Sequence, residues 1–399
     1  MKFANNSVDE IFQLNEEFKH NSRKDKINGG IGIYLDEEGK PFVIPVVKKA
    51  ISLMHFDNFN YLPLSGDPTF LKETCQIMLG KNLFLDKENL ISKQGVMGGT
   101  NGLYIWSMFI KQLYKRPTII IATPTWENHQ RIFSHHKFKI ISFNHLDKNG
   151  SFNIKALERQ LKRHPESEVL FQAGSTHNPT GINPSKDQWD QIANLIQENK
   201  NKVLFDFAYM GLGNNIDQDS FAIRLFTKKK IPISVVLSFS KNMTLYQNRT
   251  GALFIFSKTK REKNAIDERL KYFFRIVNSN PSAFGELVVK VILESRELKT
   301  EWIKSLQQMV NSLKKRREFF AKYTAGQFDF VKQGEGLFSL LGLNQPQIKT
   351  LKIKYGIFLL SNSRLNFGGL SLASIPKVAE AILSLSQAFS DYPSSRYQV

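Results

Sequence analysis

The pattern of apolar and polar positions predicts that strands and helices alternate through the middle of the chain. Short apolar runs rich in Ile, Val, Leu and Phe and bounded by polar residues are typical of buried strands. Such runs occupy 118–122, 139–143, 168–173, 202–207, 233–237 and 252–256. Helical spacing lies between them at about 129–135, 154–163, 186–198 and 220–226. This alternation predicts an α/β protein with a mostly parallel sheet covered by helices on both faces.

The two ends of the chain have a different pattern. The other elements we expect are helices at about 8–18, 45–54 and 69–79, a helical region at 283–323, strands at 336–341, 356–360 and 365–367, and a last helix at 375–389 before a frayed tail at 390–399. We therefore expect a large domain at 45–295. A smaller α+β domain would combine 1–44, as an N-terminal arm, with 296–399.

Polar and aromatic residues follow several of the predicted strands, at the edge of the sheet where parallel strands end. These residues are Trp126, Asn178, Asp206, Tyr209, Ser238 and Lys241. Ligands of α/β sheets bind at that edge. A partly desolvated lysine beside another cation, such as Arg249, is a more reactive amine and suits Schiff-base formation with an aldehyde cofactor. The glycines and threonine of 98–102 open a helix whose backbone N–H groups can bind a phosphate.

Composition and charge narrow the class of protein. The 399 residues are 41% hydrophobic and 23% charged, as in ordinary globular proteins. No apolar run is long enough to span a membrane, the first residues do not resemble a signal peptide, and a lone cysteine, Cys75, fits a reducing cytoplasm. Histidines and cysteines do not cluster at metal-ligand spacing, so no metal is expected. The net charge of +19 comes from scattered basic runs. We interpret it as a solvated surface that attracts anionic substrates, with no nucleic-acid partner.

Six motifs resemble the aspartate and aromatic amino-acid aminotransferases, which are class I pyridoxal-phosphate enzymes. In chain order they are Asn28-Gly-Gly-Ile-Gly-Ile-Tyr, Tyr61-Leu-Pro-Leu-Ser-Gly, Pro124-Thr-Trp-Glu-Asn-His, His177-Asn-Pro-Thr-Gly, Ser238-Phe-Ser-Lys-Asn-Met and Arg249-Thr-Gly. The similarity runs from about residue 7 to about residue 389. It implies the type I fold of pyridoxal-phosphate-dependent transferases, with a large cofactor-binding domain and a smaller α+β domain. It also implies a homodimer with shared active sites.

The resemblance assigns a role to each candidate cofactor residue. Lys241 would hold pyridoxal phosphate as a Schiff base and carry the proton during a ping-pong transfer. Asp206 would keep the pyridine nitrogen protonated, which makes the ring an electron sink. The other cofactor contacts would be Asn178 and Tyr209 at the phenolic oxygen, Trp126 on the ring, Gly99, Thr100, Ser238 and Arg249 at the phosphate, and Tyr61 at the phosphate of the neighbouring subunit.

Two arginines would read the substrate. Arg364 matches the arginine that binds the α-carboxylate. Arg275 matches the one that reaches from the partner subunit to the distal carboxylate of aspartate, glutamate or 2-oxoglutarate. Gly32, Trp126 and Asn178 would complete the substrate site. The implied activity is transfer of an amino group from aspartate or an aromatic amino acid, or both, to 2-oxoglutarate. The motifs do not choose between these donors.

Two alternatives remain open at this point: another pyridoxal-phosphate reaction on the same fold, such as β-elimination, and a non-catalytic basic binding protein. Arg275 argues against the first because it suits dicarboxylates, and the presence of Lys241 and Asp206 argues against the second. The chain also departs from the family pattern. Gly98 and Asn101 lie where Ser-Gly-Thr-Gly is usual, and Asn278 stands where a tyrosine is usual.

Overall fold

The computed structural model describes residues 9–54, 59–174 and 176–388. They form two compact units, the larger from 43–177 and 182–310 and the smaller from the described residues within 1–42, 178–181 and 311–399. Helix α13 (Arg296–Tyr323) begins in the larger unit and ends in the smaller one. The expected helix boundaries at residues 8 and 389 and the expected tail at 390–399 lie outside the described residues.

The larger unit is built on a seven-stranded sheet in the order β2-β8-β7-β6-β5-β3-β4. Its strands are β2 (Ile91–Val96), β3 (Thr118–Thr123), β4 (Lys139–Asn144), β5 (Glu168–Gln172), β6 (Lys202–Phe207), β7 (Ile233–Ser238) and β8 (Gly251–Phe256). Only β8 runs against its neighbours, β2 and β7; the other pairs are parallel. The mostly parallel α/β sheet predicted from the sequence is confirmed. Strand β2 was not expected, because Ser92, Lys93 and Gln94 interrupt its apolar pattern.

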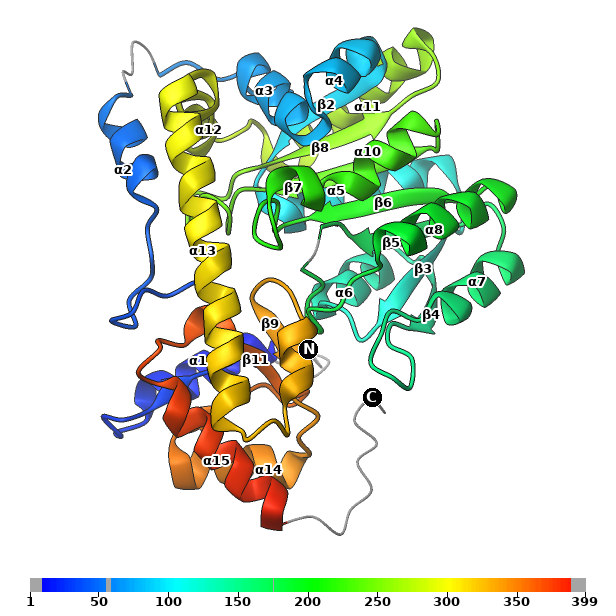
Figure 1. Ribbon diagram of the computed structural model, residues 1–399. Helices are drawn as coiled ribbons and strands as arrows, with labels where there is room; N and C mark the ends of the chain where they lie inside the picture. The colour runs from blue at the N-terminus through cyan, green and yellow to red at the C-terminus, as the bar shows by residue number, and fades with distance from the viewer. Residues whose placement is uncertain (1–8, 55–58, 175, 389–399) are drawn as a thin grey trace, which may run out of the picture. The chain divides into compact units, whose positions relative to one another are not determined.

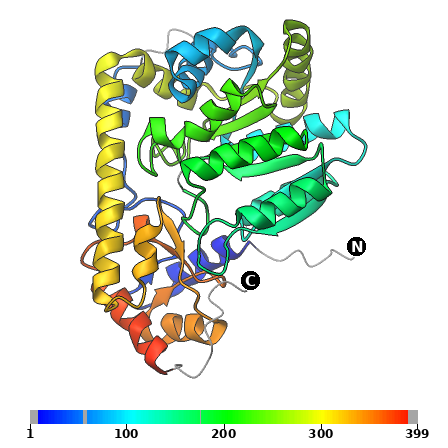
Figure 2. The same cartoon turned by 45° about the vertical axis from the view of Figure 1, so that its right-hand side comes forward.

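Helices cover both faces of this sheet (Figures 1 and 2). The helices of the larger unit are α2 (Pro45–Ser52), α3 (Pro68–Leu79), α4 (Lys81–Lys87), α5 (Gly98–Leu113), α6 (Glu127–His135), α7 (Ile154–Arg163), α8 (Lys186–Glu198), α9 (Ile216–Asp219), α10 (Phe221–Lys228), α11 (Lys260–Asn278) and α12 (Ala283–Glu294), and not all of them lie on the sheet. Helix α5 contacts α6 and α11, whereas α8 contacts α7 and α10. Strand β7, which lies between β8 and β6, is buried along its whole length, which explains its continuous apolar run.

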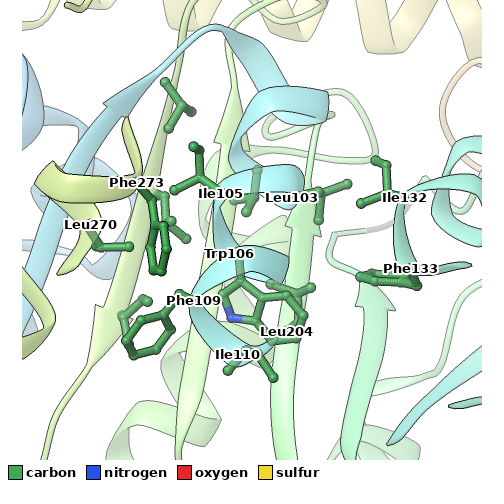
Figure 3. Packing of buried hydrophobic residues seen from close by; sticks show 14 of the residues in the cluster. Leu103, Ile105, Trp106, Phe109, Ile110, Ile132, Phe133, Leu204, Leu270 and Phe273 are labelled. Atoms are coloured by element: carbon green, nitrogen blue, oxygen red, sulfur yellow. The ribbon is translucent and has the colours of Figure 1, made fainter. Parts of the chain in front are cut away.

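One face of the sheet is sealed by a large aromatic and aliphatic cluster around α5 (Figure 3). Trp106 is fully buried at its centre, with Phe133 of α6 and Phe273 of α11 in the same cluster. Burial of one such side chain stabilises the fold by roughly 1.5–3 kcal/mol. This packing holds the first turn of α5 at the edge of the sheet, because that turn and Trp106 belong to the same helix.

The helical region expected at 283–323 is interrupted. Ser295 is extended, and its Oγ accepts a hydrogen bond from the backbone N–H of Leu298 at 3.2 Å, so it ends α12 and caps α13. A serine at this position competes with the helix for backbone hydrogen bonds, which is why it is favoured at a helix start.

The smaller unit has two short two-stranded sheets and flanking helices. Its elements are α1 (Glu10–His20), β1 (Ile27–Asn28), β9 (Phe338–Leu340), α14 (Gln345–Thr350), β10 (Ile357–Phe358), β11 (Arg364–Asn366) and α15 (Ile375–Ala388). Strand β1 pairs in parallel with β10, and β11 pairs antiparallel with β9. The buried Arg316 of α13 donates to the carbonyls of Phe367 and Gly368 and to Glu37, which ties the N-terminal arm to this unit.

Within the described ranges, no helix combines the length and the apolar character needed to cross a membrane.

Candidate active site

The end of β7 positions Lys241 in the larger unit. After Ser238 the chain leaves the sheet, and the backbone N–H of Ser240 donates to Ser238 Oγ at 3.2 Å, which forms a tight turn. Lys241 follows this turn, and its Nζ lies 5.2 Å from the centre of the Tyr209 ring. The lysine is half-buried and the tyrosine is buried. The strand therefore delivers an amine to the carboxyl edge of the sheet, beside an aromatic ring.

Asp206 is buried near the end of β6 and has one strong partner. His129 Nε2 lies 3.0 Å from Asp206 Oδ2, and His129 Nδ1 lies 2.8 Å from Thr125 Oγ1. Gln172 Nε2 donates to the same Thr125 oxygen at 3.2 Å. Trp126 meets the His129 ring edge to face, at 5.3 Å between centroids. This chain of polar contacts fixes the orientation of the Asp206 carboxylate.

The second Asp206 oxygen, Oδ1, is buried and has no hydrogen-bond partner among the described residues. A buried carboxylate oxygen without a donor is costly, and native structures rarely leave one in that state. A methyl group built on Gly99 would lie 3.9 Å from this oxygen and 3.7 Å from Ser238 Cβ. The first turn of α5, Asp206 and Ser238 thus approach one another.

The first turn of α5 is shaped for a close approach. Gly98 has φ +76°, and a methyl group there would come within 2.6 Å of Arg249 Nη2, so only glycine fits. No side chain caps this turn, so the N–H groups of Gly98, Gly99 and Thr100 remain for an anion. Arg249 is held beside it by bonds to Ser240 Oγ at 3.2 Å and to the Tyr246 carbonyl at 3.3 Å.

In the smaller unit the structure brings Arg364 and Asn178 together. Arg364 is buried on β11, and its Nη1 donates to Asn178 Oδ1 at 3.1 Å while Nη2 donates to the Gly30 carbonyl at 2.9 Å. The guanidinium lies 4.3 Å from the centre of the Phe338 ring on the paired strand β9. A methyl group on Gly32 would meet no atom within 4 Å, so this glycine faces open space.

Arg275 and Tyr61 belong to the larger unit and are exposed. Arg275 lies in the last turn of α11, and its Nη1 donates to Ser279 O at 3.1 Å and to Ser279 Oγ at 2.9 Å. Tyr61 lies in the loop before α3 and is 87% exposed, and Phe59 in the same loop is 92% exposed. Large exposed apolar side chains that are close together in one loop favour a surface that another protein covers.

Sequence reasoning missed the partners of Asp206. His129 was quoted in the Pro124–His129 motif without a role, and neither Thr125 nor Gln172 was singled out. Thr125 directly precedes Trp126, the N-cap of α6, and His129 lies in the first turn of that helix. Their separation of only four residues, at a predicted helix start, was the available indication.

The fold and these residues define an α/β enzyme with a lysine, a buried carboxylate and an anion-binding helix start in one unit, and a buried arginine in the other. The family model for class I and II aminotransferases matches residues 24–382. The chain belongs to this family, as its motifs predicted, and it is an aminotransferase.

Individual proteins agree with this assignment. The aspartate aminotransferase of Haemophilus influenzae is 33% identical over 387 residues, which cover 95% of this chain and 98% of that protein. The crystal structure of the aromatic-amino-acid aminotransferase of Burkholderia pseudomallei, covalently bound to pyridoxal phosphate, has a TM-score of 0.91 and 28% identity, over 96% of this chain and 98% of that one. The aromatic amino acid aminotransferase of Psychrobacter sp. B6, cocrystallised with aspartic acid, has a TM-score of 0.91 and 29% identity, over 96% and 98%. The predicted type I fold is confirmed.

Proposed function

We propose that this chain moves an amino group from aspartate, an aromatic amino acid or both to 2-oxoglutarate, with Lys241 as the residue that binds the cofactor covalently. The enzyme depends on pyridoxal phosphate, as expected for the family to which it belongs. When bound, this cofactor supplies an aldehyde that condenses with amines and a ring that stabilises negative charge at the substrate Cα.

The observation that supports the proposal most strongly is the buried Asp206 oxygen that lacks a hydrogen-bond donor. Oδ1 is buried without a donor in the part of the chain that the structure describes, while Oδ2 is held by His129. A protonated ring nitrogen is the kind of donor that such an oxygen accepts. The residues therefore fit the pyridine end of the cofactor. The uncapped turn 98–100 and Arg249 fit its phosphate, because backbone N–H groups and a guanidinium both bind phosphate oxygens.

Each residue around the proposed cofactor site then has its own role in the reaction. Lys241 Nζ carries a proton between substrate and cofactor, and general acid–base transfer of this kind contributes roughly two to four orders of magnitude. Asp206 maintains the charge state of the ring nitrogen, and the His129–Thr125 contacts hold its carboxylate in place. With the cofactor bound, Tyr209 and Asn178 would donate to its phenolic oxygen, Trp126 would cover the ring, and Ser238 would add a hydroxyl at the phosphate.

Two arginines, Arg364 and Arg275, recognise the substrate. Arg364 binds the α-carboxylate that every amino acid and 2-oxo acid presents, and Gly32 and Asn178 belong to the same unit. Arg275 binds a distal carboxylate, which aspartate and 2-oxoglutarate have and aromatic donors lack. Planar bidentate binding of a carboxylate favours arginine at both positions.

The working form is a homodimer with shared sites. The dimer is supported by the exposure of three large side chains, Phe59, Tyr61 and Ile276. Ile276 directly follows Arg275 and is 59% exposed. An isolated subunit would leave these apolar groups in water. A second subunit would cover them and would receive Tyr61 and Arg275 at its own site. Location in the cytoplasm and the domain boundaries at 44/45 and 295/296 stay predictions.

The test is to reduce the holoenzyme with borohydride, digest it and map the pyridoxyl label. We expect the label on Lys241, and none in Lys241→Ala, which should still bind the cofactor but react at a vanishing rate. The matched control is Lys258→Ala, which removes an exposed lysine beyond the neighbouring strand and should keep both label and activity. A label on any other lysine would remove Lys241 from the mechanism.

A further inference from the structure

Two residues at which the chain departs from its family are in direct contact. Asn101 Nδ2 donates to Asn278 Oδ1 at 2.9 Å, although 177 positions separate the two residues. Asn278 Nδ2 in turn lies 2.9 Å from Met97 Sδ. Both asparagines are half-buried. The last residue of α11 is therefore bound to the first turn of α5.

Asn101 also organises the turn to which it belongs. Its Oδ1 accepts a hydrogen bond at 3.0 Å from the backbone N–H of Met97, the residue that precedes α5. This bond satisfies the N–H just outside the helix and leaves those of Gly98, Gly99 and Thr100 for a phosphate. The Asn101 side chain thus accepts a hydrogen bond from the phosphate-binding turn and donates one to the end of α11.

The end of α11 connects the other pieces of the proposed site. Arg275 lies one turn before Asn278 and is bonded to Ser279, which has φ +65° and ends the helix. Asn280 Nδ2 donates to the Leu62 carbonyl at 2.7 Å, next to Tyr61. The segment 275–280 therefore links the distal-carboxylate arginine, the Tyr61 loop and, through Asn278, the phosphate-binding turn.

We propose that Asn101 and Asn278 form a positioning pair that couples cofactor binding to the reading of dicarboxylate substrates. Neither asparagine is among the residues assigned to the cofactor or to the substrate. The pair sets the place of the Arg275 helix end relative to the turn that holds the cofactor phosphate. This inference rests on the proposed function, since it concerns the relative position of two parts of that proposed site.

The coupling has a direct physical basis. A change in the first turn of α5 moves Asn101, and Asn101 moves the helix end that presents Arg275 to the neighbouring subunit. Conversely, Asn278 restrains Asn101, whose oxygen orders the phosphate-binding turn. Loss of one hydrogen bond between two such elements loosens both, and side chains that share a bond have non-additive effects.

The experiment is a double-mutant cycle of Asn101→Ala, Asn278→Ala and the double variant. Its first readout is the dissociation constant of pyridoxal phosphate from the apoenzyme, measured by equilibrium dialysis. We expect each single variant to bind the cofactor roughly 2- to 12-fold more weakly, as for the loss of one hydrogen bond. The dissociation constant of the double variant should be no higher than the higher of the two single-variant values. The second readout is the ratio of kcat/KM for the aspartate and phenylalanine half-reactions. It should fall in Asn278→Ala as well as in Asn101→Ala.

The matched control is Asn264→Ala, which removes an exposed asparagine from the same helix α11 and should change neither readout. Additive effects of the two variants on cofactor affinity would overturn the inference. So would a lower melting temperature with an unchanged substrate ratio, because that result describes a merely structural contact. A wild-type protein that binds no pyridoxal phosphate, or reacts with neither donor, would instead refute the proposed function itself.

Discussion

The two arginines assigned to substrate recognition lie in very different surroundings. Arg364 is only 4% exposed, and its guanidinium is held by Asn178, the Gly30 carbonyl and the Phe338 ring, all within the smaller unit. Arg275 is exposed at the end of α11 in the larger unit and binds only its own helix end through the contacts that we observe.

This difference separates an arginine that is held by neighbouring groups of its own unit from one that is exposed at a helix end. A buried arginine whose two terminal nitrogens are already hydrogen-bonded loses little conformational freedom when a carboxylate arrives, so its site is preorganised. An exposed arginine must first be ordered. We infer that recognition of the α-carboxylate is a property of the single chain, whereas recognition of the side chain depends on dimer formation.

The strongest test of the comparison is Arg364→Leu. Every substrate presents an α-carboxylate, so every half-reaction should lose about 2–5 kcal/mol of transition-state binding, or roughly 30- to several thousand-fold in kcat/KM. Single-turnover kinetics with aspartate and phenylalanine measure this. Arg364→Lys, which keeps the charge but not the planar fork, should recover only part of the loss. Normal rates with either donor would mean that another group binds the α-carboxylate.

Arg275→Leu should divide the substrates. Aspartate and 2-oxoglutarate should lose a comparable 2–5 kcal/mol, because about that much is lost when one partner of a desolvated pair is removed. The phenylalanine half-reaction should be spared. Arg269→Leu, which removes another exposed arginine of α11, serves as the control and should affect no substrate. Equal losses for aspartate and phenylalanine would show that Arg275 does not read the side chain.

Within the larger unit, a buried carboxyl group of α12 should also respond to pH. Glu286 of α12 accepts a hydrogen bond at 2.6 Å from the backbone N–H of Asp67, next to the Tyr61 loop, and Asp67 itself pairs with Lys290 at 3.2 Å. Burial raises the pKa of Glu286 to about 8, and the nearby Asp67 charge acts in the same direction.

A carboxyl whose pKa is raised in the folded state stabilises the fold below its unfolded pKa of 4.5 and loses that contribution as pH rises toward about 8. The free energy of unfolding should fall by at most about 1.4 kcal/mol per pH unit across this window. Urea unfolding between pH 5 and pH 9 should show this slope in the wild type and a flatter one in Glu286→Gln, whose amide oxygen can still accept from Asp67. Parallel slopes would contradict the assignment.

The smallest expected effect concerns the ring under Arg364. Phe338→Leu removes a cation–π contact worth about 0.5–2 kcal/mol, so KM should rise roughly 2- to 30-fold for all substrates alike. Phe320→Leu removes a fully buried ring of the same unit and is the control for lost packing. It should lower the melting temperature without changing KM. If both variants change KM equally, the ring acts through packing alone.

The sequence by itself determined the elements and the chemistry that each one carries. The apolar run of β7, the lysine after it and the glycines that open α5 are local features. Strand burial, turn formation and helix capping depend on neighbouring residues, so their patterns can be read directly. The motifs that identified the family also assigned roles to Arg364 and Asp206 before any contact was known.

Only the tertiary structure decided which distant residues meet. The contact of His129 with Asp206, the bond between Asn101 and Asn278, and the ring of Phe338 under Arg364 join positions far apart in the chain. Strand β2 belongs to the same class, because its polar residues become a strand through pairing with β8 and not through their own pattern. Such contacts depend on which strands lie side by side in the sheet and on which helices pack against them. Local propensity carries no information on that spatial arrangement.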